Sequence, residues 1–185
     1  MFEREQFIED CKRVIAEYDT PHAIREVVAR AVSEPGAVIQ SLGEPQRGGI
    51  ETIHHADDLT IINVIWGPGM TIMPHNHNMW AVIGVYGGQE DNVFYQRGED
   101  GLEEHGHKAL LTKDTIPLGA PAIHAVTNPL DKLTAAIHVY GGDFFDTPRS
   151  EWDPDSLVEM PYNVEKTLRL FEESNARWDE IRTGG

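Results

Sequence analysis

The stretch GMTIMPHNHNMWAVIGVY, residues 69–86, places two histidines between runs of strand-forming residues. Successive side chains of a strand point to opposite faces of its sheet, so His75 and His77 share a face if this segment is extended. Two imidazoles on one face can bind a single metal ion at about 2.0–2.2 Å without distortion of the backbone. Pro74 cannot donate a ladder hydrogen bond and belongs at a strand start or edge, which places the pair near a barrel mouth. Paired histidines also occur in ordinary strands, so the spacing alone leaves a purely structural role open.

Further strands surround this stretch in the sequence. From about residue 50, short runs of β-branched and aromatic residues alternate with turns rich in glycine and proline. The runs are TIINVIW (60–66), WAVIGVY (80–86), NVFYQR (92–97), AIHAVT (122–127) and LTAAIHVY (133–140). Many short strands at fairly regular spacing predict a β-sandwich or barrel, here over residues 50–149.

Helical patterns flank the predicted β body. Apolar residues recur at helical spacing in residues 2–18, and Thr20 followed by Pro21 predicts a second helix that ends at SEPG, residues 33–36. A C-terminal helix is predicted over residues 161–181. The sequence therefore predicts a single domain over residues 1–185, with a helical segment at 1–35, a β-barrel at 50–149 and one C-terminal helix.

Charge and composition exclude several classes of partner. The 185 residues include 31 acidic and 15 basic side chains, a formal net charge of −16, which would repel a phosphate backbone. No apolar run approaches the roughly 18–20 residues of a membrane span, and the N-terminus MFEREQFIEDCKRV lacks the features of a signal peptide. We expect a cytoplasmic protein without nucleic-acid or membrane partners. Cys11 is the only cysteine and lies in a helical apolar stripe, which favours core packing.

Two motifs resemble the metal-binding motifs of the cupin superfamily, which has a double-stranded β-helix barrel. GMTIMPHNH (69–77) has the form Gly-x5-His-x-His, and HAVTN (124–128), which begins 47 residues after His77, has the form His-x3-Asn. The resemblance implies that His75, His77 and His124 bind one metal ion. It agrees with the strand pattern, so the expected fold is an all-β dominated cupin barrel with N-terminal helices and a C-terminal helix.

The chain departs from the common cupin pattern at one ligand. Many cupins carry a glutamate four or five residues after the second histidine, where this chain has Ala81 and Val82. Three neutral imidazoles leave a divalent ion with its full charge, which favours uptake of an anionic substrate beside a gas molecule. Imidazole suits iron, copper, nickel and zinc, so the ligands themselves do not select the metal.

Longer segments resemble the cysteine dioxygenase group, in particular its bacterial thiol dioxygenases that act on 3-mercaptopropionate or cysteine. The segments are HNHNMWAVIGV (75–85), IHAVTNP (123–129) and AAIHVYGGDFFDTPR (135–149), within a likeness that covers about residues 59–149. The resemblance implies Fe(II) as the cofactor and addition of both atoms of O2 to a substrate thiolate, which gives a sulfinate.

The same resemblance implies catalytic roles for Tyr140 and His138. They match a His-x-Tyr pair beneath the metal, where a phenol can donate a hydrogen bond to dioxygen or to the substrate sulfur. The family commonly has a serine at the position of Ala136, which predicts a shortened relay in this chain. The crosslink between cysteine and tyrosine found in one branch is excluded, because Cys11 is the only thiol.

Arg149 lies nine residues beyond Tyr140, where the bacterial branch has an arginine that pairs with the substrate carboxylate. A guanidinium can bind a carboxylate through two parallel hydrogen bonds and so fix the orientation of the substrate. An arginine at the end of a β-rich segment can equally be a surface ion-pair partner, here for Glu151 or Asp153. The sequence leaves both interpretations open.

Other histidines do not fit a metal site. His105 and His107 follow the polar segment RGEDGLEE, which predicts a solvated loop between strands. His54 and His55 are adjacent, so at most one of them can point inward from a strand. His22 falls in the first turn of the second predicted helix and is most simply a surface residue.

The leading hypothesis is an Fe(II)-dependent dioxygenase, an oxidoreductase that converts a small carboxylate-bearing thiol to its sulfinate. The alternatives are a cupin metalloenzyme that acts on another small organic acid and a non-catalytic barrel that binds a metal or ligand. A catalytic site requires an open coordination position and polar groups around it, which His138 and Tyr140 would supply. The expected partners are the thiol and O2, and the sequence identifies no oligomeric interface.

Overall fold

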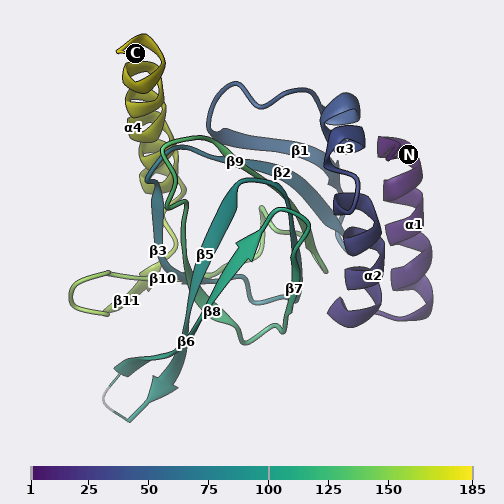
Figure 1. Ribbon diagram of the computed structural model, residues 1–185. Helices are drawn as coiled ribbons and strands as arrows, with labels where there is room; N and C mark the ends of the chain where they lie inside the picture. The colour runs from purple at the N-terminus through teal and green to yellow at the C-terminus, as the bar shows by residue number, and fades with distance from the viewer. Residues whose placement is uncertain (1, 100, 185) are drawn as a thin grey trace.

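Two antiparallel sheets with helices on their outer sides form the chain in a computed structural model, which describes residues 2–99 and 101–184 (Figure 1). The helices are α1 (Arg4–Glu17), α2 (Pro21–Val32), α3 (Pro35–Leu42) and α4 (Val164–Thr183). The strands are β1 (Gly49–His55), β2 (Thr60–Trp66), β3 (Thr71–Asn76), β4 (Ala81–Gly87), β5 (Gln89–Gly98), β6 (Gly101–Leu111), β7 (Thr115–Leu118), β8 (Ile123–Thr127), β9 (Thr134–Tyr140), β10 (Ser150–Trp152) and β11 (Glu159–Pro161). The sheet orders are β1-β2-β9-β4-β7 and β11-β10-β3-β8-β5-β6. The predicted fold class, a mostly β body flanked by helices, is confirmed.

The N-terminal helical segment is longer than predicted. The helix start at Thr20 is confirmed, since its side chain accepts a hydrogen bond from Ala23 N at 3.3 Å and Pro21 takes the first helical position. The predicted end of this helix at SEPG is also confirmed, since α2 ends at Val32, but a further helix follows directly. Pro35 begins α3, because proline is well tolerated where a helix starts and its missing N–H needs no partner. The helices therefore reach Leu42 rather than residue 35.

Two short strands separate the barrel from the last helix. β10 and β11 pair over residues 150–161, between the predicted barrel and the predicted C-terminal helix. β10 also pairs with β3, with Glu151 opposite His75, and so extends the six-stranded sheet beyond residue 149. α4 starts at Val164, three residues later than predicted, after Asn163 accepts a capping hydrogen bond from Lys166 N at 3.0 Å.

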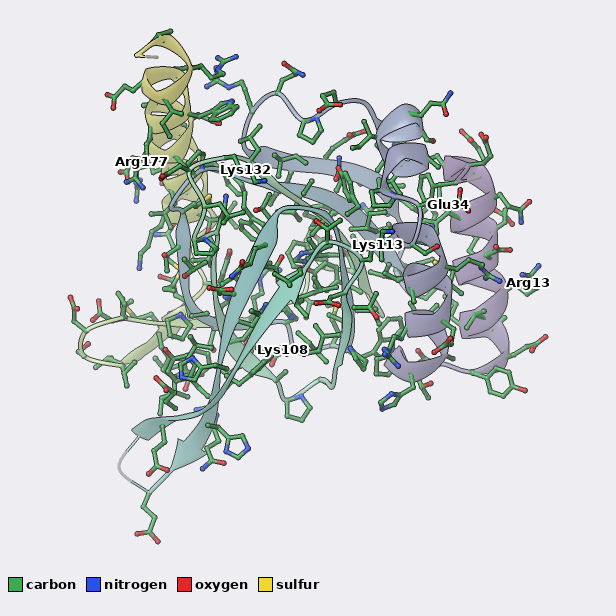
Figure 2. All side chains as sticks on the ribbon, in the orientation of Figure 1. Arg13, Glu34, Lys108, Lys113, Lys132 and Arg177 are labelled. Carbon is green, nitrogen blue, oxygen red and sulfur yellow. The ribbon has the colours of Figure 1, made fainter. Side chains whose placement is uncertain are left out.

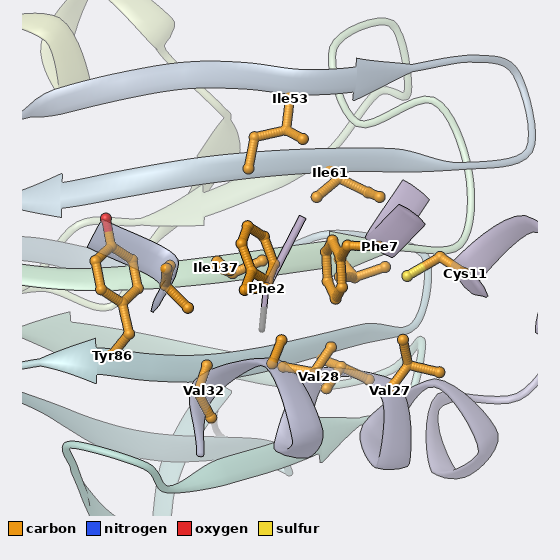
Figure 3. Packing of buried hydrophobic residues seen from close by; sticks show 14 of the residues in the cluster. Phe2, Phe7, Cys11, Val27, Val28, Val32, Ile53, Ile61, Tyr86 and Ile137 are labelled. Atoms are coloured by element: carbon orange, nitrogen blue, oxygen red, sulfur yellow. The ribbon is translucent and has the colours of Figure 1, made fainter. Parts of the chain in front are cut away.

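The central strands of the five-stranded sheet are buried on both faces. Alternate side chains of β2 and β9 point toward α1 and α2 on one side and toward the six-stranded sheet on the other. Figure 3 shows the helix side, where Phe7 and Cys11 of α1 and Val28 of α2 pack against Ile61 and Ile137. This double burial explains why TIINVIW and TAAIHVY are nearly continuous apolar runs.

Gly84 lets α2 approach the sheet closely. A Cβ atom at position 84 would lie 2.4 Å from Cγ1 of Val28 and 3.0 Å from Cγ1 of Val32. These separations are too short for any side chain larger than hydrogen. The glycine in WAVIGVY therefore serves helix–sheet packing.

Most of the charged side chains lie on the outer surface. Arg13 of α1, Lys108 of β6 and Arg177 of α4 are exposed and project from the ribbon in Figure 2. Within residues 2–99 and 101–184, no helix combines the length and the apolar character needed to cross a membrane.

The space between the two sheets receives the residues of the histidine motifs. β3 and β8 are antiparallel neighbours in which His75 lies opposite His124, after a register shift that follows Ile72. On the facing sheet, His138 and Tyr140 share one face of β9 because they are two residues apart. Segments far apart in the chain thus meet at one place.

Candidate metal centre

Three buried histidines converge between the sheets. His75 lies on β3, His77 follows that strand, and His124 lies on β8; their exposed fractions are 7%, 3% and 1%. One ring nitrogen from each lies within 4.8 Å of the others, and the ring centroids are 4.7–5.1 Å apart. Such a grouping can hold a metal ion. In the part of the chain that the structure describes, no carboxylate belongs to it.

Hydrogen bonds on the outer side of two rings leave a nitrogen of each ring free for an ion. His75 Nδ1 lies 2.9 Å from the backbone oxygen of Met73, and His124 Nδ1 lies 2.7 Å from Oδ1 of Asn92. Both oxygens are acceptors, so each Nδ1 carries hydrogen and each Nε2 presents its lone pair. Among the described residues, buried His124 Nε2 has no hydrogen-bond partner. A bound cation would satisfy this atom, and the donor set fits a divalent metal ion.

Burial keeps all three imidazoles neutral. Desolvation lowers the pKa of His75 from 6.5 to about 4 and is only partly opposed by its hydrogen bond to Met73. Desolvation and the neighbouring imidazoles hold the pKa values of His77 and His124 well below 6.5. Metal ligation requires the neutral ring, so the site is prepared for a cation at neutral pH.

The acidic residue opposite His75 does not reach this site. Glu151 faces His75 across β10 and β3, but its carboxylate accepts hydrogen bonds from Asn163 N at 2.9 Å and Lys166 Nζ at 3.0 Å. It therefore stabilises the start of α4, where a negative charge is favourable.

The asparagines of the HNHN motif hold the segment that carries Arg149. Asn76 Oδ1 accepts a hydrogen bond from Ser150 N at 2.8 Å, and Asn78 Nδ2 donates to Pro148 O at 2.8 Å. Both neighbours of Arg149 in the chain are thus tied to the turn around His77. The motif contributes histidines to the site and asparagines to its border.

The Arg149 side chain lies in the same cavity as the three histidines. Its guanidinium is placed between the rings of Phe144 and Tyr162, at 4.1 and 4.3 Å from their centroids, and Nη1 donates to the Phe144 carbonyl. Its buried Nε has no hydrogen-bond partner among the described residues. The surface ion pair considered from sequence is wrong, because in residues 2–99 and 101–184 no carboxylate lies within 4.0 Å of this guanidinium.

The cavity itself is small and mostly apolar. Its volume is about 30 Å³, roughly two water molecules. Apart from the histidines, Tyr140 and Arg149, the lining includes Ile62, Val64, Trp66, Ile72, Phe144 and Phe171. Arg149 also borders an open groove of about 420 Å³ on the outside, so it lies between the cavity and solvent.

His138 and Tyr140 form a buried pair in the lining of the cavity. His138 Nδ1 and the Tyr140 hydroxyl lie 3.0 Å apart, and the Tyr140 ring is 5.1 Å from the ring of His77. Desolvation raises the pKa of Tyr140 above its ordinary value of 10.0, so the residue is a protonated phenol. The structure brings this pair beside the three histidines.

The predicted shortening of the relay at Ala136 is wrong, because a different residue continues it. Glu90 on β5 is fully buried, and its Oε2 lies 3.3 Å from His138 Nε2 and 2.8 Å from Trp66 Nε1. Its Oε1 accepts from Asn92 Nδ2 at 3.1 Å. Burial alone would raise the pKa of Glu90, but hydrogen bonds from His138, Asn92 and Trp66 lower it below 4.5. Glu90 is therefore an ionised carboxylate beneath the site.

The remaining histidines stay away from the site. His105 and His107 lie on β6 rather than in the predicted loop, and they are exposed, with His107 Nε2 2.6 Å from Glu104 Oε1. Exposed His55 contacts Asp143 at 2.8 Å, while neighbouring His54 is half-buried on β1. His22 is exposed on α2.

Cys11 lies in the core, as predicted. It is fully buried in the cluster between the helices and the five-stranded sheet. Burial raises the pKa of its thiol to about 12, so it stays protonated and unreactive.

Sequence reasoning missed Glu90, Asn92, Phe144 and Tyr162. Glu90 and Asn92 share the inward face of β5. Polar residues occur on both faces of that strand, so its sequence does not indicate which face is buried. Phe144 and Tyr162 reach the cavity from segments outside the central strands. Only the i, i+2 spacing of Glu90 and Asn92 in a predicted strand offered a signal.

No protein family's sequence profile matches this chain. Solved structures with a similar fold include cupin superfamily proteins. The DMSP lyase DddQ from Ruegeria pomeroyi has a TM-score of 0.47 and 18% identity, with 60% of this chain and 54% of the lyase covered. An RmlC-like cupin from Methanocaldococcus jannaschii has a TM-score of 0.46 and 9% identity, with coverage of 55% and 85%. A Bacillus subtilis oxalate decarboxylase has a TM-score of 0.45 and 13% identity, with coverage of 56% and 28%.

This chain therefore spans about half of the lyase and about a quarter of the decarboxylase. These likenesses concern the fold alone. Fold and site together define a mostly β protein of two antiparallel sheets with a three-histidine candidate metal centre.

Proposed function

We propose that this protein is an Fe(II)-dependent dioxygenase that oxidises a small carboxylate-bearing thiol, of the 3-mercaptopropionate or cysteine class, to its sulfinate. In the overall reaction a thiolate and O2 give a sulfinate. Both oxygen atoms bond to sulfur, which loses the four electrons that reduce O2. Iron held by His75, His77 and His124 would supply the redox chemistry that lets O2 react with the thiolate.

The observation that carries the proposal is the position of Arg149. Its guanidinium lines the same cavity as the three histidines and has no carboxylate partner among the described residues. A buried cation with an unused donor is suited to an anionic ligand that enters from outside. A substrate carboxylate at Arg149 would direct the other end of a short molecule toward the histidines.

The walls of the cavity support the same chemistry. Phe144 and Tyr162 restrict the guanidinium to one orientation, which favours a bidentate contact with a planar carboxylate. The apolar lining limits water around reactive oxygen. Arg149 lines both this cavity and the outer groove, and we expect the substrate to enter beside it.

The Tyr140 hydroxyl would contact the reacting groups. It lines the cavity and is held by His138, which limits its reorganisation when substrate binds. Because its pKa is raised, it keeps its proton and acts through hydrogen bonds.

The test is oxygen uptake by the full chain, purified without a tag and loaded anaerobically with Fe²⁺. We expect uptake with 3-mercaptopropionate or cysteine, little uptake with cysteamine, which lacks a carboxylate, and a sulfinate that contains both atoms of isotopically labelled O2. An iron-loaded protein that consumes no O2 with any of these thiols would overturn the proposal.

A cupin metalloenzyme for another small organic acid is the second candidate. The favouring observation is that Arg149 recognises a carboxylate, while no feature of the apolar lining selects sulfur. Stable binding of small carboxylic acids to the metal-loaded protein without thiol oxidation would support this candidate.

A further inference from the structure

Glu90 stands at the centre of a hydrogen-bond network that reaches two histidines. Its carboxylate is fully buried and meets three side-chain groups: Trp66 Nε1, Asn92 Nδ2 and His138 Nε2. An ionised carboxylate can only accept hydrogen bonds. Each of the three neighbours must therefore donate to it, and this requirement fixes the direction of every hydrogen bond further out.

One branch runs through Asn92 to a proposed metal ligand. Because the Asn92 amide nitrogen donates to Glu90 Oε1, its Oδ1 faces His124 and must accept from Nδ1. With hydrogen on Nδ1, His124 has its lone pair on Nε2, the buried atom that points into the site without a partner.

The other branch runs through His138 to Tyr140. In the tautomer that carries its hydrogen on Nε2, His138 donates to Glu90 Oε2, and its Nδ1 accepts from the Tyr140 hydroxyl. His138 thereby holds the Tyr140 hydroxyl at the border of the cavity.

We infer that Glu90 is a positioning residue that sets the protonated nitrogen of both His124 and His138, and so prepares one histidine for metal binding and the other to hold Tyr140. The inference rests on the metal centre in the proposed function but not on thiol oxidation. Ala136 has no polar group that could hydrogen-bond to His138. Glu90 of β5, in the other sheet, supplies a carboxylate for His138 instead.

The substitution Glu90→Gln separates the two branches. Trp66 Nε1 can only donate, so the oxygen of the introduced amide must occupy the Oε2 position, where it also accepts from His138. The introduced amide nitrogen then faces the Asn92 nitrogen. Asn92 must turn over, which places its nitrogen against His124 Nδ1 and moves the ring hydrogen to Nε2. His124 would lose the lone pair that a metal requires.

A compensating exchange tests this logic. In the double variant Glu90→Gln/Asn92→Asp, the introduced amide nitrogen donates to the introduced carboxylate, whose other oxygen again accepts from His124 Nδ1. The total charge equals that of the native protein. Asn92→Asp alone places two carboxylates in contact, which is unfavourable. The two changes are therefore expected to be strongly non-additive.

The experiment compares the native chain, Glu90→Gln, Asn92→Asp and the double variant, all at full length. Each protein is titrated with Co²⁺ and with Zn²⁺ in competition with a chromophoric chelator. We expect Glu90→Gln to weaken binding by about 10–100-fold and the double variant to recover most of that loss. Tyr86→Phe serves as the matched control, since it removes a buried hydrogen bond to Asn63 without touching the site. A double variant that binds more weakly than either single variant would overturn the inference.

A second measurement requires no metal binding. Nitrogen-15 NMR of the labelled, metal-free chain reports which ring nitrogen carries hydrogen, with signals assigned by the variants His124→Gln and His138→Gln. We expect hydrogen on Nδ1 of His124 and on Nε2 of His138, and the opposite pattern at either ring would overturn the inference. Neither measurement uses a thiol. Both therefore test the role of Glu90 even if the protein does not oxidise thiols.

Discussion

His75 and His124 lie directly opposite each other on the paired strands β3 and β8, with ring centroids 4.7 Å apart. His77 shares their site because it lies two residues beyond His75. The register of one pair of strands therefore brings together His75 and His124, which are 49 positions apart in the chain. Several measurable properties follow from that register and from the burial of the three rings.

Removal of one histidine should abolish tight metal binding. We expect His124→Ala to lower the affinity for Zn²⁺ by about 100-fold or more, because one of the three protein ligands is lost. Equilibrium dialysis with metal analysis measures the change. His105→Ala is the control, since that residue is exposed on β6 and should leave the affinity unchanged. Equal affinities for the native and His124→Ala proteins would contradict the assignment.

The metal-free protein should lose stability as the pH falls below about 6.5. Burial lowers the pKa of His75 from 6.5 to about 4 and the pKa values of His77 and His124 to well below 6.5. Below pH 6.5 these histidines are therefore protonated in the unfolded chain before they are protonated in the folded chain. Stability from a lowered folded pKa is fully present above the unfolded value and is lost as the pH falls through the folded value. For His75 alone the loss approaches about 3 kcal/mol.

Urea denaturation in the presence of a chelator, repeated between about pH 7 and pH 4.5, measures this dependence. The comparison variant is His75→Gln, which should make the profile less steep but not level, because His77 and His124 still contribute. A native profile that is level between these pH values would show that the imidazoles are not held neutral by the fold.

Arg149→Ala should weaken recognition of carboxylate-bearing thiols. We expect KM for 3-mercaptopropionate to rise by about 10–100-fold, because a charge-assisted bidentate contact is lost. Cysteamine should be affected little, since it has no carboxylate. Steady-state oxygen uptake gives both values. Arg97→Ala is the matched control, because Arg97 pairs with Glu159 and packs on Trp152 outside the cavity. An unchanged KM would remove Arg149 from the substrate site.

Tyr140→Phe should slow the reaction without loss of metal. The ring keeps its packing against Phe144 at 4.2 Å, while the hydroxyl that meets His138 is removed. We expect kcat to fall by about 100-fold, with metal content equal to that of the native protein. Tyr86→Phe, the same change at a buried tyrosine on the other side of the sheet, should leave kcat unaltered. Full activity of Tyr140→Phe would exclude the hydroxyl from the reaction.

Gly84→Ala should destabilise the fold through overpacking. The added methyl group would lie 2.4 Å from Val28 Cγ1, and we expect a loss of about 1–3 kcal/mol in the free energy of unfolding. Gly87→Ala is the matched control on the same strand, where a Cβ would lie 3.7 Å from Ala135 Cβ, an ordinary contact. Urea denaturation compares the two, and a smaller loss for Gly84→Ala than for Gly87→Ala would contradict the packing described.

The sequence contained enough information for the β body and for the three histidines, because strand periodicity and motif spacing are local signals. TIINVIW and TAAIHVY could be recognised as strands from composition, and His75 and His77 from their spacing. The third helix was missed because Pro35 was interpreted as a helix stop, although proline also begins helices.

The network behind the histidines could not be predicted, because it depends on tertiary pairing. Ala136 indicated a missing partner for His138, yet the partner comes from β5 in the other sheet. Likewise, no local pattern shows that Phe144 and Tyr162, 18 positions apart, enclose the same guanidinium. Such contacts follow from strand order and loop path rather than from periodicity.

X-ray absorption spectroscopy of the Fe²⁺-loaded full chain tests the central claim most directly. We expect three imidazole nitrogens at about 2.0–2.2 Å, with the outer scattering of three histidine rings and no protein carboxylate among the ligands. The same spectrum should lose one imidazole in His124→Ala. A spectrum fitted by a carboxylate ligand, or by fewer than three imidazoles in the native protein, would contradict a neutral three-histidine centre.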